Sequence, residues 1–236
     1  YMNKVIKDPI IKKVLEHCGD YLINQPMLKY KGYKSWKSIS ISSNLPLTGM
    51  SHGASGFALA LYSLYNLIPK KKYYECLRDC FNYEDNFFDK KKNNWLDLRG
   101  FDNLNPNQWC HGAVGIGFSR LSMIKIKRKK LLINDLEKAI NSSLNAWPNI
   151  KDTICCGKMS TILFLYDYSK FTKNNEIKNL AINYLYSTIK LSKINKGYNL
   201  GAKYYYNPGL FLGLSGIGYV ILNFLDNDLP NIQTLS

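Results

Sequence analysis

The amino-acid sequence predicts an all-α protein, and three observations support that fold class. Apolar residues recur every three to four positions along most of the chain, which is the period of an amphipathic helix. The apolar–polar alternation typical of β-strands is scarce. Four glycine-marked segments, roughly 45 to 60 residues apart, each lead into another helix-like stretch, which indicates a repeated helical unit.

Six apolar stripes define the expected amphipathic helices in chain order. They lie at residues 10–22, 57–68, 73–81, 132–144, 177–185 and 217–225. Each stripe gives its helix one apolar face, which must be buried against a neighbouring element. Cys18, Cys76 and Cys80 fall on stripes of this kind, so we expect their side chains in the core.

The four glycine-marked segments open short helices that are apolar on nearly all sides. They read GMSHGASGFALALY from Gly49, WCHGAVGIGFSRL from Trp109, CCGKMSTILFLY from Cys155 and GLFLGLSGIGYVIL from Gly209. A longer and more amphipathic helix follows each of them. A helix that is apolar all round must be buried, whereas an amphipathic helix can shield it from water. We therefore predict an α/α toroid, in which inner helices are ringed by outer helices, with about four helix pairs in this chain.

This arrangement predicts where the chemistry lies. The inner helices of such a ring run parallel, so their N-termini all face one mouth, and glycines there allow tight turns and close approach of backbones. Side chains at the starts of the inner helices should therefore converge, although they are far apart in sequence. Five such residues can carry chemistry: His52, Cys110, His111, Cys155 and Cys156.

The charge of the chain invites a nucleic-acid-binding interpretation, because the formal net charge is +15. However, the lysines accompany abundant asparagine, isoleucine and tyrosine, a mixture that biased codon usage produces without any binding role. The basic clusters at residues 69–72, 89–92 and 125–130 fall where turns between helices are expected. We interpret them as a solvated rim and expect no nucleic-acid partner. A non-catalytic module that binds an acidic partner through its lysines remains an alternative.

The cysteine content points to a reducing compartment. The chain has six cysteines, and its N-terminal segment lacks the basic-then-apolar pattern of a secretory signal. No stretch of about 18 uncharged apolar residues occurs, so we expect no transmembrane segment and a cytoplasmic location. With Cys18, Cys76 and Cys80 assigned to the core, Cys110, Cys155 and Cys156 remain to be explained.

These three thiols are candidate zinc ligands. Zinc prefers tetrahedral sulfur and nitrogen ligands, and a catalytic zinc site has three protein ligands and one open position. Helix N-termini stabilise thiolates, the form that binds metal. Alternatively, Cys110 is a small buried hydrophobe, and Cys155 and Cys156 form a vicinal disulfide or pack independently. His52 could bond only a nearby carbonyl, and His111 could only orient a ligand.

A three-thiolate zinc site with an open position suits a substrate thiol. The metal lowers the pKa of that thiol and supplies a thiolate nucleophile, and a nearby histidine can move the proton. Zinc prenyltransfer on an α/α toroid uses the same logic and is an alternative. Glycosidases need two carboxylates across a cleft, whereas these helix starts offer histidine and cysteine.

Together the motifs resemble those of LanC-like lanthionine cyclases. The segments GMSHGASG, WCHGAVGIG, CCG and PGLFLGLSGIGY are similar, in order and spacing, to the family signatures. WLDLRG at residues 95–100 and LPNIQTLS at 229–236 resemble most closely the C-terminal cyclase domain of class II lanthipeptide synthetases, the LanM type. The resemblance covers residues 49–236, and it implies that residues 1–236 form a partial cyclase domain, about four of seven helix pairs, without the N-terminal dehydratase domain.

The resemblance implies an enzyme that uses one Zn²⁺ to activate a cysteine of a dehydrated precursor peptide. The thiol adds to dehydroalanine or dehydrobutyrine and closes a thioether ring. Cys110 and Cys155 take the two cysteine-ligand places, and Cys156 takes the third, where many relatives carry histidine. His52 falls on the acid/base histidine, and His111 has a supporting catalytic role.

Two further expectations follow from departures from the family pattern. The family's acidic partner of the active-site histidine lies upstream, and Asp20 is the only nearby candidate here. The third segment reads GKMS where a second glycine is usual, so we expect a looser turn at that helix start.

Overall fold

The structure is a computed structural model that describes residues 8–39, 43–100, 106–127, 129–145, 151–201, 206–226 and 228–234. Helices dominate these residues, which confirms the predicted all-α class. In chain order the helices are α2 (Pro9–Asn24), α3 (Ala54–Leu67), α4 (Lys71–Asp85), α5 (Ala113–Ile126), α6 (Lys130–Asn145), α7 (Lys158–Thr172), α8 (Asn175–Ile194) and α9 (Leu214–Leu225). None of the helices in the described part of the chain is long and apolar enough to cross a membrane.

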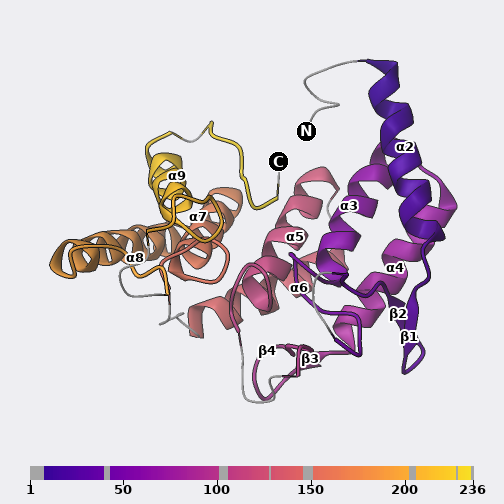
Figure 1. The fold of residues 1–236 in the computed structure, drawn as a ribbon, viewed down its shortest axis with the longest axis horizontal. Coiled ribbons are helices and arrows are strands. Elements are labelled where there is room, and N and C mark those ends of the chain that lie inside the picture. The colour runs from indigo at the N-terminus through magenta and orange to yellow at the C-terminus, as the bar shows by residue number, and fades with distance from the viewer. Residues whose placement is uncertain are drawn as a thin grey trace.

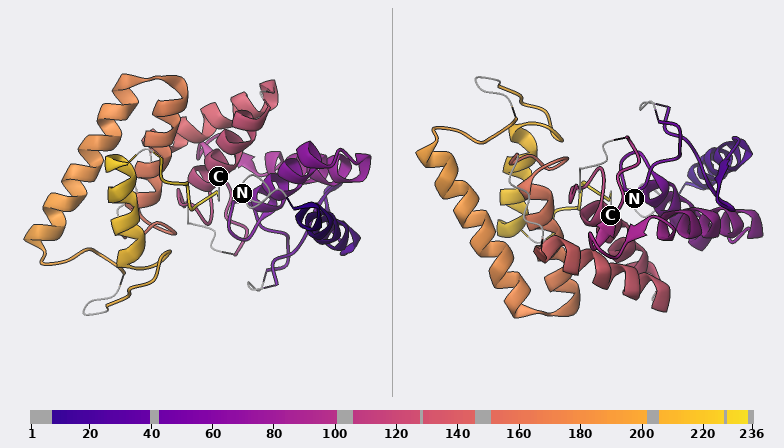
Figure 2. Two further views of the ribbon diagram at one scale, coloured as in Figure 1. Left: turned by 90° about the horizontal axis from the view of Figure 1, so that it is seen from above. Right: turned by 90° about the horizontal axis from the view of Figure 1, so that it is seen from below.

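The helices form successive pairs of inner and outer helices (Figure 1). Helices α3 and α4, α5 and α6, and α7 and α8 pack against each other, and short connections make the members of each pair antiparallel neighbours. The pairs follow one another as an arc from α2 to α9 (Figures 1 and 2). Helix α9 continues the inner series, so the described residues contain three complete pairs and the inner helix of a fourth.

Burial separates the inner helices from the outer ones, as the sequence pattern predicts. Every residue of α5 from Ala113 to Ile124 is buried, whereas α8 buries only Ala181, Leu185 and Thr188. Neighbouring inner helices meet directly, because the rings of Phe118 on α5 and Phe164 on α7 lie 5.1 Å apart. A helix without a polar face can exist in water only in such a position.

Two small hairpins were not predicted. Strands β1 (Leu28–Tyr30) and β2 (Tyr33–Ser35) pair antiparallel, and so do β3 (Phe88–Asp89) and β4 (Asn94–Trp95). Strands of two or three residues are too short to show a recognisable alternation. The second hairpin matters for the site, because β4 leads directly into residues 96–100.

The first helix packs differently from the expectation. Cys18 is exposed rather than in the core, and so are Ile10, Val14 and Tyr21 of the same predicted stripe. The buried residue of α2 is Gly19, which lies so close to Leu64 of α3 that a side chain at this position would clash. This close contact turns one side of the predicted stripe outward, whereas Leu15 and Leu22 of that stripe still pack against the core. Cys80 is buried as expected, and Cys76 is half-buried.

A buried ionic network joins four helices behind the helix starts. The guanidinium of Arg120 on α5 is fully buried and lies 2.8 Å from a Glu84 oxygen on α4 and 3.0 Å from an Asp135 oxygen on α6. Glu84 also accepts a hydrogen bond from the hydroxyl of Ser55 on α3. Removing one partner from such a network leaves a buried charge without compensation, which makes the network a determinant of how these helices sit together.

Candidate metal centre

Each inner helix begins at a glycine that follows a tight loop. We call the residues just before these glycines the start segments. The N-cap glycines are Gly53, Gly112, Gly157 and Gly213. Gly112 requires glycine most clearly, because its φ is 91° and a Cβ there would lie 1.8 Å from the Pro106 carbonyl oxygen.

The expectation of a looser turn at the third start segment is wrong. Gly157 has φ −144° and ψ −172°, close to the −135° and −167° of Gly53. A Cβ at Gly157 would lie 2.5 Å from the Lys151 carbonyl oxygen, so the backbone is as tightly folded here as in the other start segments. Ser160, which replaces the second glycine, is buried inside α7, where its hydroxyl donates to the Gly157 carbonyl at 2.8 Å.

Backbone hydrogen bonds connect the four start segments in order. The N–H of Ser51 donates to the carbonyl of Cys110 at 3.4 Å, and the N–H of Cys110 donates to the carbonyl of Cys155 at 3.4 Å. The N–H of Cys155 in turn donates to the carbonyl of Phe211 at 3.0 Å. All four residues stand two positions before their N-cap glycine. This ladder is the physical reason that residues from four distant parts of the sequence meet at one place.

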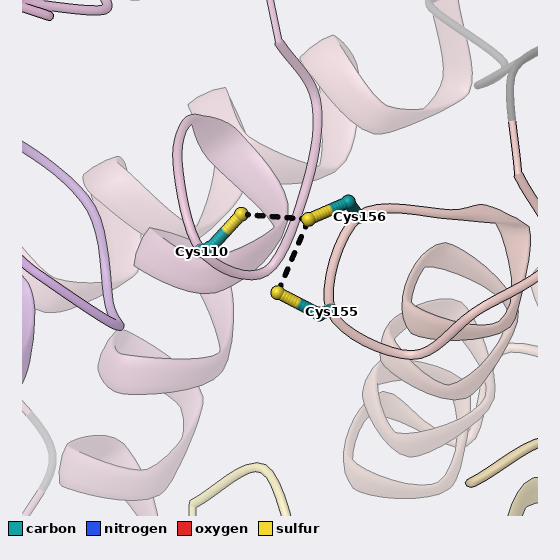
Figure 3. Close-up of side chains that lie close together, drawn as sticks. All are labelled: Cys110, Cys155 and Cys156. Carbon is teal, nitrogen blue, oxygen red and sulfur yellow. Dashed lines mark hydrogen bonds between the residues drawn. The ribbon is translucent and has the colours of Figure 1, made fainter. Parts of the chain in front are cut away.

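The ladder brings the three candidate thiols together (Figure 3). Cys156 Sγ lies 3.3 Å from Cys110 Sγ and 3.1 Å from Cys155 Sγ. All three sulfurs lie within 4.8 Å of one another. Cys110 is buried, whereas Cys155 and Cys156 are half-buried, so the cluster is reached from the side of the third start segment.

The central position of Cys156 determines which thiol ionises first. Hydrogen bonding with Cys110 and Cys155 lowers the pKa of Cys156 to about 3, because the two neighbouring thiols stabilise its thiolate. Hydrogen bonding with Cys155 and then Cys156, followed by burial, raises the pKa of Cys110. The cluster therefore holds one thiolate readily, and more negative charge there calls for a cation.

The donor set fits a zinc ion. A tetrahedral zinc with Zn–S distances of about 2.3 Å places its sulfurs about 3.8 Å apart. The sulfur contacts of 3.1 and 3.3 Å would have to widen by about 0.7 and about 0.5 Å. Three thiolates leave one coordination position open, as in catalytic zinc sites.

The two histidines stand next to each other in the first and second start segments. His52, His111 and Cys156 all directly precede their N-cap glycine, so they occupy equivalent positions. The rings of His52 and His111 are stacked with centroids 5.7 Å apart. His111 is buried and His52 is half-buried. The structure thus brings all five predicted residues to one region.

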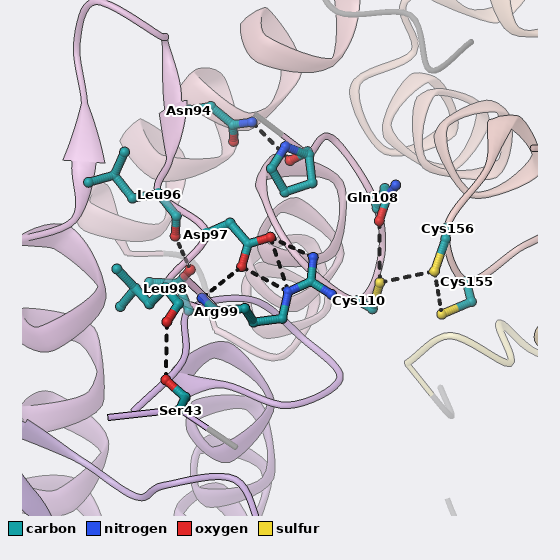
Figure 4. Close-up of polar contacts among 12 residues, drawn as sticks. Ser43, Asn94, Leu96, Asp97, Leu98, Arg99, Gln108, Cys110, Cys155 and Cys156 are labelled. Atoms are coloured by element: carbon teal, nitrogen blue, oxygen red, sulfur yellow. Dashed lines mark hydrogen bonds and ion pairs between the residues drawn. The ribbon is translucent and has the colours of Figure 1, made fainter. Parts of the chain in front are cut away.

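An ion pair beside the thiols was missed by the sequence analysis. Arg99 binds Asp97 through two guanidinium nitrogens at 2.5 to 3.1 Å, and the Asp97 side chain is fully buried (Figure 4). Burial raises the pKa of Asp97, but the hydrogen bonds from Arg99 outweigh it and hold that pKa below its usual value. Both residues belong to WLDLRG, which carried the family resemblance but suggested no role.

Arg99 sets the electrostatic environment of the two histidines. Burial lowers the pKa of His52, and the positive charge of Arg99 lowers it further. Burial followed by Arg99 lowers the pKa of His111 to about 4. Both imidazoles are therefore neutral at pH 7, which is the form that can accept a proton.

Asp20 does not belong to this site. Its carboxylate accepts a hydrogen bond from the Tyr73 hydroxyl and pairs with Lys72 at 2.7 Å, on α2 and α4. Those hydrogen bonds, from Lys72 first, lower the pKa of Asp20. Asp20 thus connects α2 to the neighbouring outer helix.

The fold and the site together define an α/α-toroid protein with a three-thiol cluster where its inner helices begin. The sequence model of the family described as "Lanthionine synthetase C-like protein" matches residues 2–235, and the chain belongs to this family. A curated relative, the lacticin 481/lactococcin biosynthesis protein LcnDR2 of Lactococcus lactis subsp. lactis, is 29% identical over 188 residues. That match covers 75% of this chain but only 20% of LcnDR2.

A solved structure confirms the toroidal fold. Nisin cyclase superposes with a TM-score of 0.64 at 17% sequence identity, covering 77% of this chain and 47% of that protein. At this identity the similarity concerns the fold alone. The chain therefore spans about a fifth of the curated relative and about half of the structural neighbour.

Proposed function

We propose that this chain is the zinc-dependent cyclase domain of a LanM-type lanthipeptide synthetase. Its substrate is a precursor peptide that a dehydratase domain of the longer enzyme has already dehydrated. A cysteine thiol of that peptide adds to dehydroalanine or dehydrobutyrine and forms a (methyl)lanthionine thioether. The single observation that carries the proposal is the meeting of Cys110, Cys155 and Cys156, at the helix starts, in a chain of this family.

The proposed ligands of the zinc are the thiolates of Cys110, Cys155 and Cys156. When bound, zinc would lower the pKa of a substrate thiol that occupies the open coordination position. Because these ligands must remain reduced, the proposal includes a cytoplasmic location. The half-buried sulfurs of Cys155 and Cys156 lie on the side from which a peptide can approach.

His52 is the proposed acid/base residue. As a neutral imidazole it accepts the proton of the substrate thiol. The sulfur then bonds to the β-carbon of the dehydroamino acid, and the electron pair of the carbon–carbon double bond moves toward the α-carbon and its carbonyl. His52 returns the proton to the α-carbon. Burial and the positive charge of Arg99 keep the imidazole in its neutral form before the reaction, and the His111 ring is stacked on it.

The metal content of the purified, reduced chain tests the proposal. We expect about one zinc per chain in the wild type, and close to none after Cys156→Ala, because two thiolates no longer complete the site. Cys18→Ala is the matched control, since Cys18 is a free, exposed cysteine on α2 and its loss should leave the zinc in place. Elemental analysis against protein concentration gives the stoichiometry.

Ring closure provides the functional readout. On a dehydrated precursor peptide, the wild type should consume free thiols, counted by alkylation and mass spectrometry, and Cys156→Ala should not. Stoichiometric zinc that persists after substitution of all three cysteines would contradict the ligand assignment.

A further inference from the structure

The chain after α9 turns back and lies against the loops that carry the thiols. In Figure 1 this yellow segment leaves α9 and runs toward α5. Asn231 and Gln233 within it are 8% and 2% exposed. Two side-chain amides are thus buried near the surface of the helical ring. Each needs hydrogen-bond partners to offset the loss of its hydrogen bonds to water.

Gln233 bonds to both thiol-bearing loops. Its side-chain amide donates to the carbonyl of Ile154 at 2.8 Å, and Ile154 directly precedes Cys155. Its main-chain carbonyl accepts from the indole N–H of Trp109 at 3.0 Å, and Trp109 directly precedes Cys110. Trp109 and Ile154 hold the same position, three residues before the N-cap glycine of their segments. A single residue therefore spans the second and third start segments.

Gln233 is itself held in place by its neighbours. The side-chain oxygen of Asn231 accepts from the Gln233 N–H at 2.8 Å. The Asn231 amide donates to Asp167 on α7 at 2.6 Å, and Asp167 is paired with Lys170 at 3.0 Å. The Trp109 ring is stacked on Phe211, with centroids 4.9 Å apart. The segment is thus anchored directly on α7, and its partner Trp109 packs against the fourth start segment.

We propose that residues 228–234 form a strap that fixes the separation of the two thiol-bearing loops, and that Gln233 is a positioning residue for the metal centre. The inference rests on the proposed function. The direct backbone bond between these loops, from Cys110 N–H to Cys155 carbonyl, is long at 3.4 Å. A ligand set divided between two loops binds metal tightly only if their separation is already correct in the free protein. Groups behind the ligands typically contribute roughly 10- to 100-fold to metal affinity.

Zinc affinity measured by competition with a chromophoric chelator tests the strap. Gln233→Met keeps the side-chain length but removes the amide, and Trp109→Phe keeps an aromatic ring on Phe211 but removes the indole donor. We expect each to bind zinc roughly 10- to 100-fold more weakly than the wild type. Thr188→Val, which removes a buried hydroxyl on α8, is the matched control and should bind as the wild type does.

A metal-free readout separates this inference from the proposed function. In the zinc-free, reduced chain, diamide takes two electrons and two protons from a thiol pair and leaves a disulfide. Mass spectrometry then gives the rate at which Cys110 is joined to Cys155 or Cys156. Loss of one strap hydrogen bond should slow that reaction by about tenfold.

The outcomes are distinguishable. A wild type without zinc, but with cross-linking slowed in Gln233→Met, overturns the proposed metal function and supports the strap. Zinc affinity and cross-linking rates equal to wild type in both variants overturn the strap, whatever their melting temperatures. A variant that unfolds earlier without zinc, yet binds zinc with wild-type affinity, assigns residues 228–234 to stability alone and also overturns it.

Discussion

Arg99 affects the chemistry of this site through its positive charge. Its partner Asp97 is fully buried and holds the guanidinium through hydrogen bonds to two nitrogens. Arg99 lowers the pKa of His52 in addition to the effect of burial. A histidine with a lowered pKa stays neutral to more acidic pH and can accept a proton there.

We expect Arg99→Met to move the acid limb of the rate–pH profile of ring closure to higher pH. His52 must be neutral to take the thiol proton, and it is neutral only above its pKa. Without the nearby positive charge that pKa rises toward its ordinary value of about 6.5, so the rate begins to fall at a higher pH on acidification. Ring closure followed by mass spectrometry across pH 5 to 8 measures the shift.

Two control variants test whether the shift is due to Arg99 acting on His52. Arg78→Met removes an arginine from α4 that lies outside the site, and its profile should match the wild type. His52→Ala should slow ring closure by roughly 100-fold or more at every pH while zinc stays bound. If the Arg99→Met profile coincides with the wild-type profile, the charge of Arg99 does not tune His52.

At the scale of elements, Glu84 on α4 binds the chain on both sides of the N-cap glycine Gly53, at Gly49 before it and at Ser55 of α3 after it. One carboxylate oxygen accepts from the Gly49 N–H at 2.9 Å, and the other accepts from Ser55 and from Arg120. His52 lies between Gly49 and Ser55 in the sequence. An outer helix thus sets the position of a loop at the ring mouth through one buried carboxylate.

We expect Glu84→Gln to destabilise the chain by about 3–5 kcal/mol, because Arg120 is fully buried and would lose one of its two charged partners. Equilibrium unfolding in urea measures the change. Glu75→Gln on the same helix is the matched control. Its ion pair with Lys71 is solvated, with the Glu75 side chain 48% exposed, and should contribute less than about 1 kcal/mol. Equal losses in the two variants would contradict a special role for the buried network.

The helix pairs and the thiol cluster could be predicted from the sequence because both depend on a local, repeated signal. His52, Cys110 and Cys155 stand at fixed offsets from glycines that open apolar helices. The same sequence pattern therefore predicts both the helix and the position of the side chain at its start. The stripe that includes Cys18 was only partly right, because the contact of Gly19 with Leu64 is tertiary and the apolar period cannot show which side of α2 it selects.

The other site residues are positioned by long-range contacts that leave no periodic pattern in the sequence. Gln233 meets Ile154 across 79 residues and Trp109 across 124, and the segment between α9 and Gln233 has no repeat to place it. Arg99 lies on a loop after a two-residue strand, and its charge acts on the histidines from there. Such residues are identified from sequence only by motif resemblance, which suggests importance but no role.

At the scale of the whole molecule, the thiol cluster lies where two helix pairs meet. Cys110 precedes α5 and Cys155 and Cys156 precede α7, so a bound metal would link the α5–α6 pair to the α7–α8 pair. In a repeat architecture each unit contacts mainly its neighbours, and stability depends on the interfaces between units. A metal bound at one interface therefore stabilises the packing between neighbouring helix pairs.

We expect removal of zinc to loosen this interface selectively. A ligand that binds only the folded state adds about 2.7 kcal/mol at a free concentration 100 times its Kd, so chelation should lower the unfolding free energy by that order. Amide hydrogen exchange should increase at the starts of α5 and α7 and remain unchanged in α4, which lies away from the cluster. The unfolding free energy of Cys156→Ala should be insensitive to the chelator.

The stabilisation by zinc should also depend on pH. Since thiolate ligands must be deprotonated, the zinc-dependent increase in unfolding free energy should shrink on acidification. An increase that is constant between pH 8 and 5 would exclude thiolate ligation as its source.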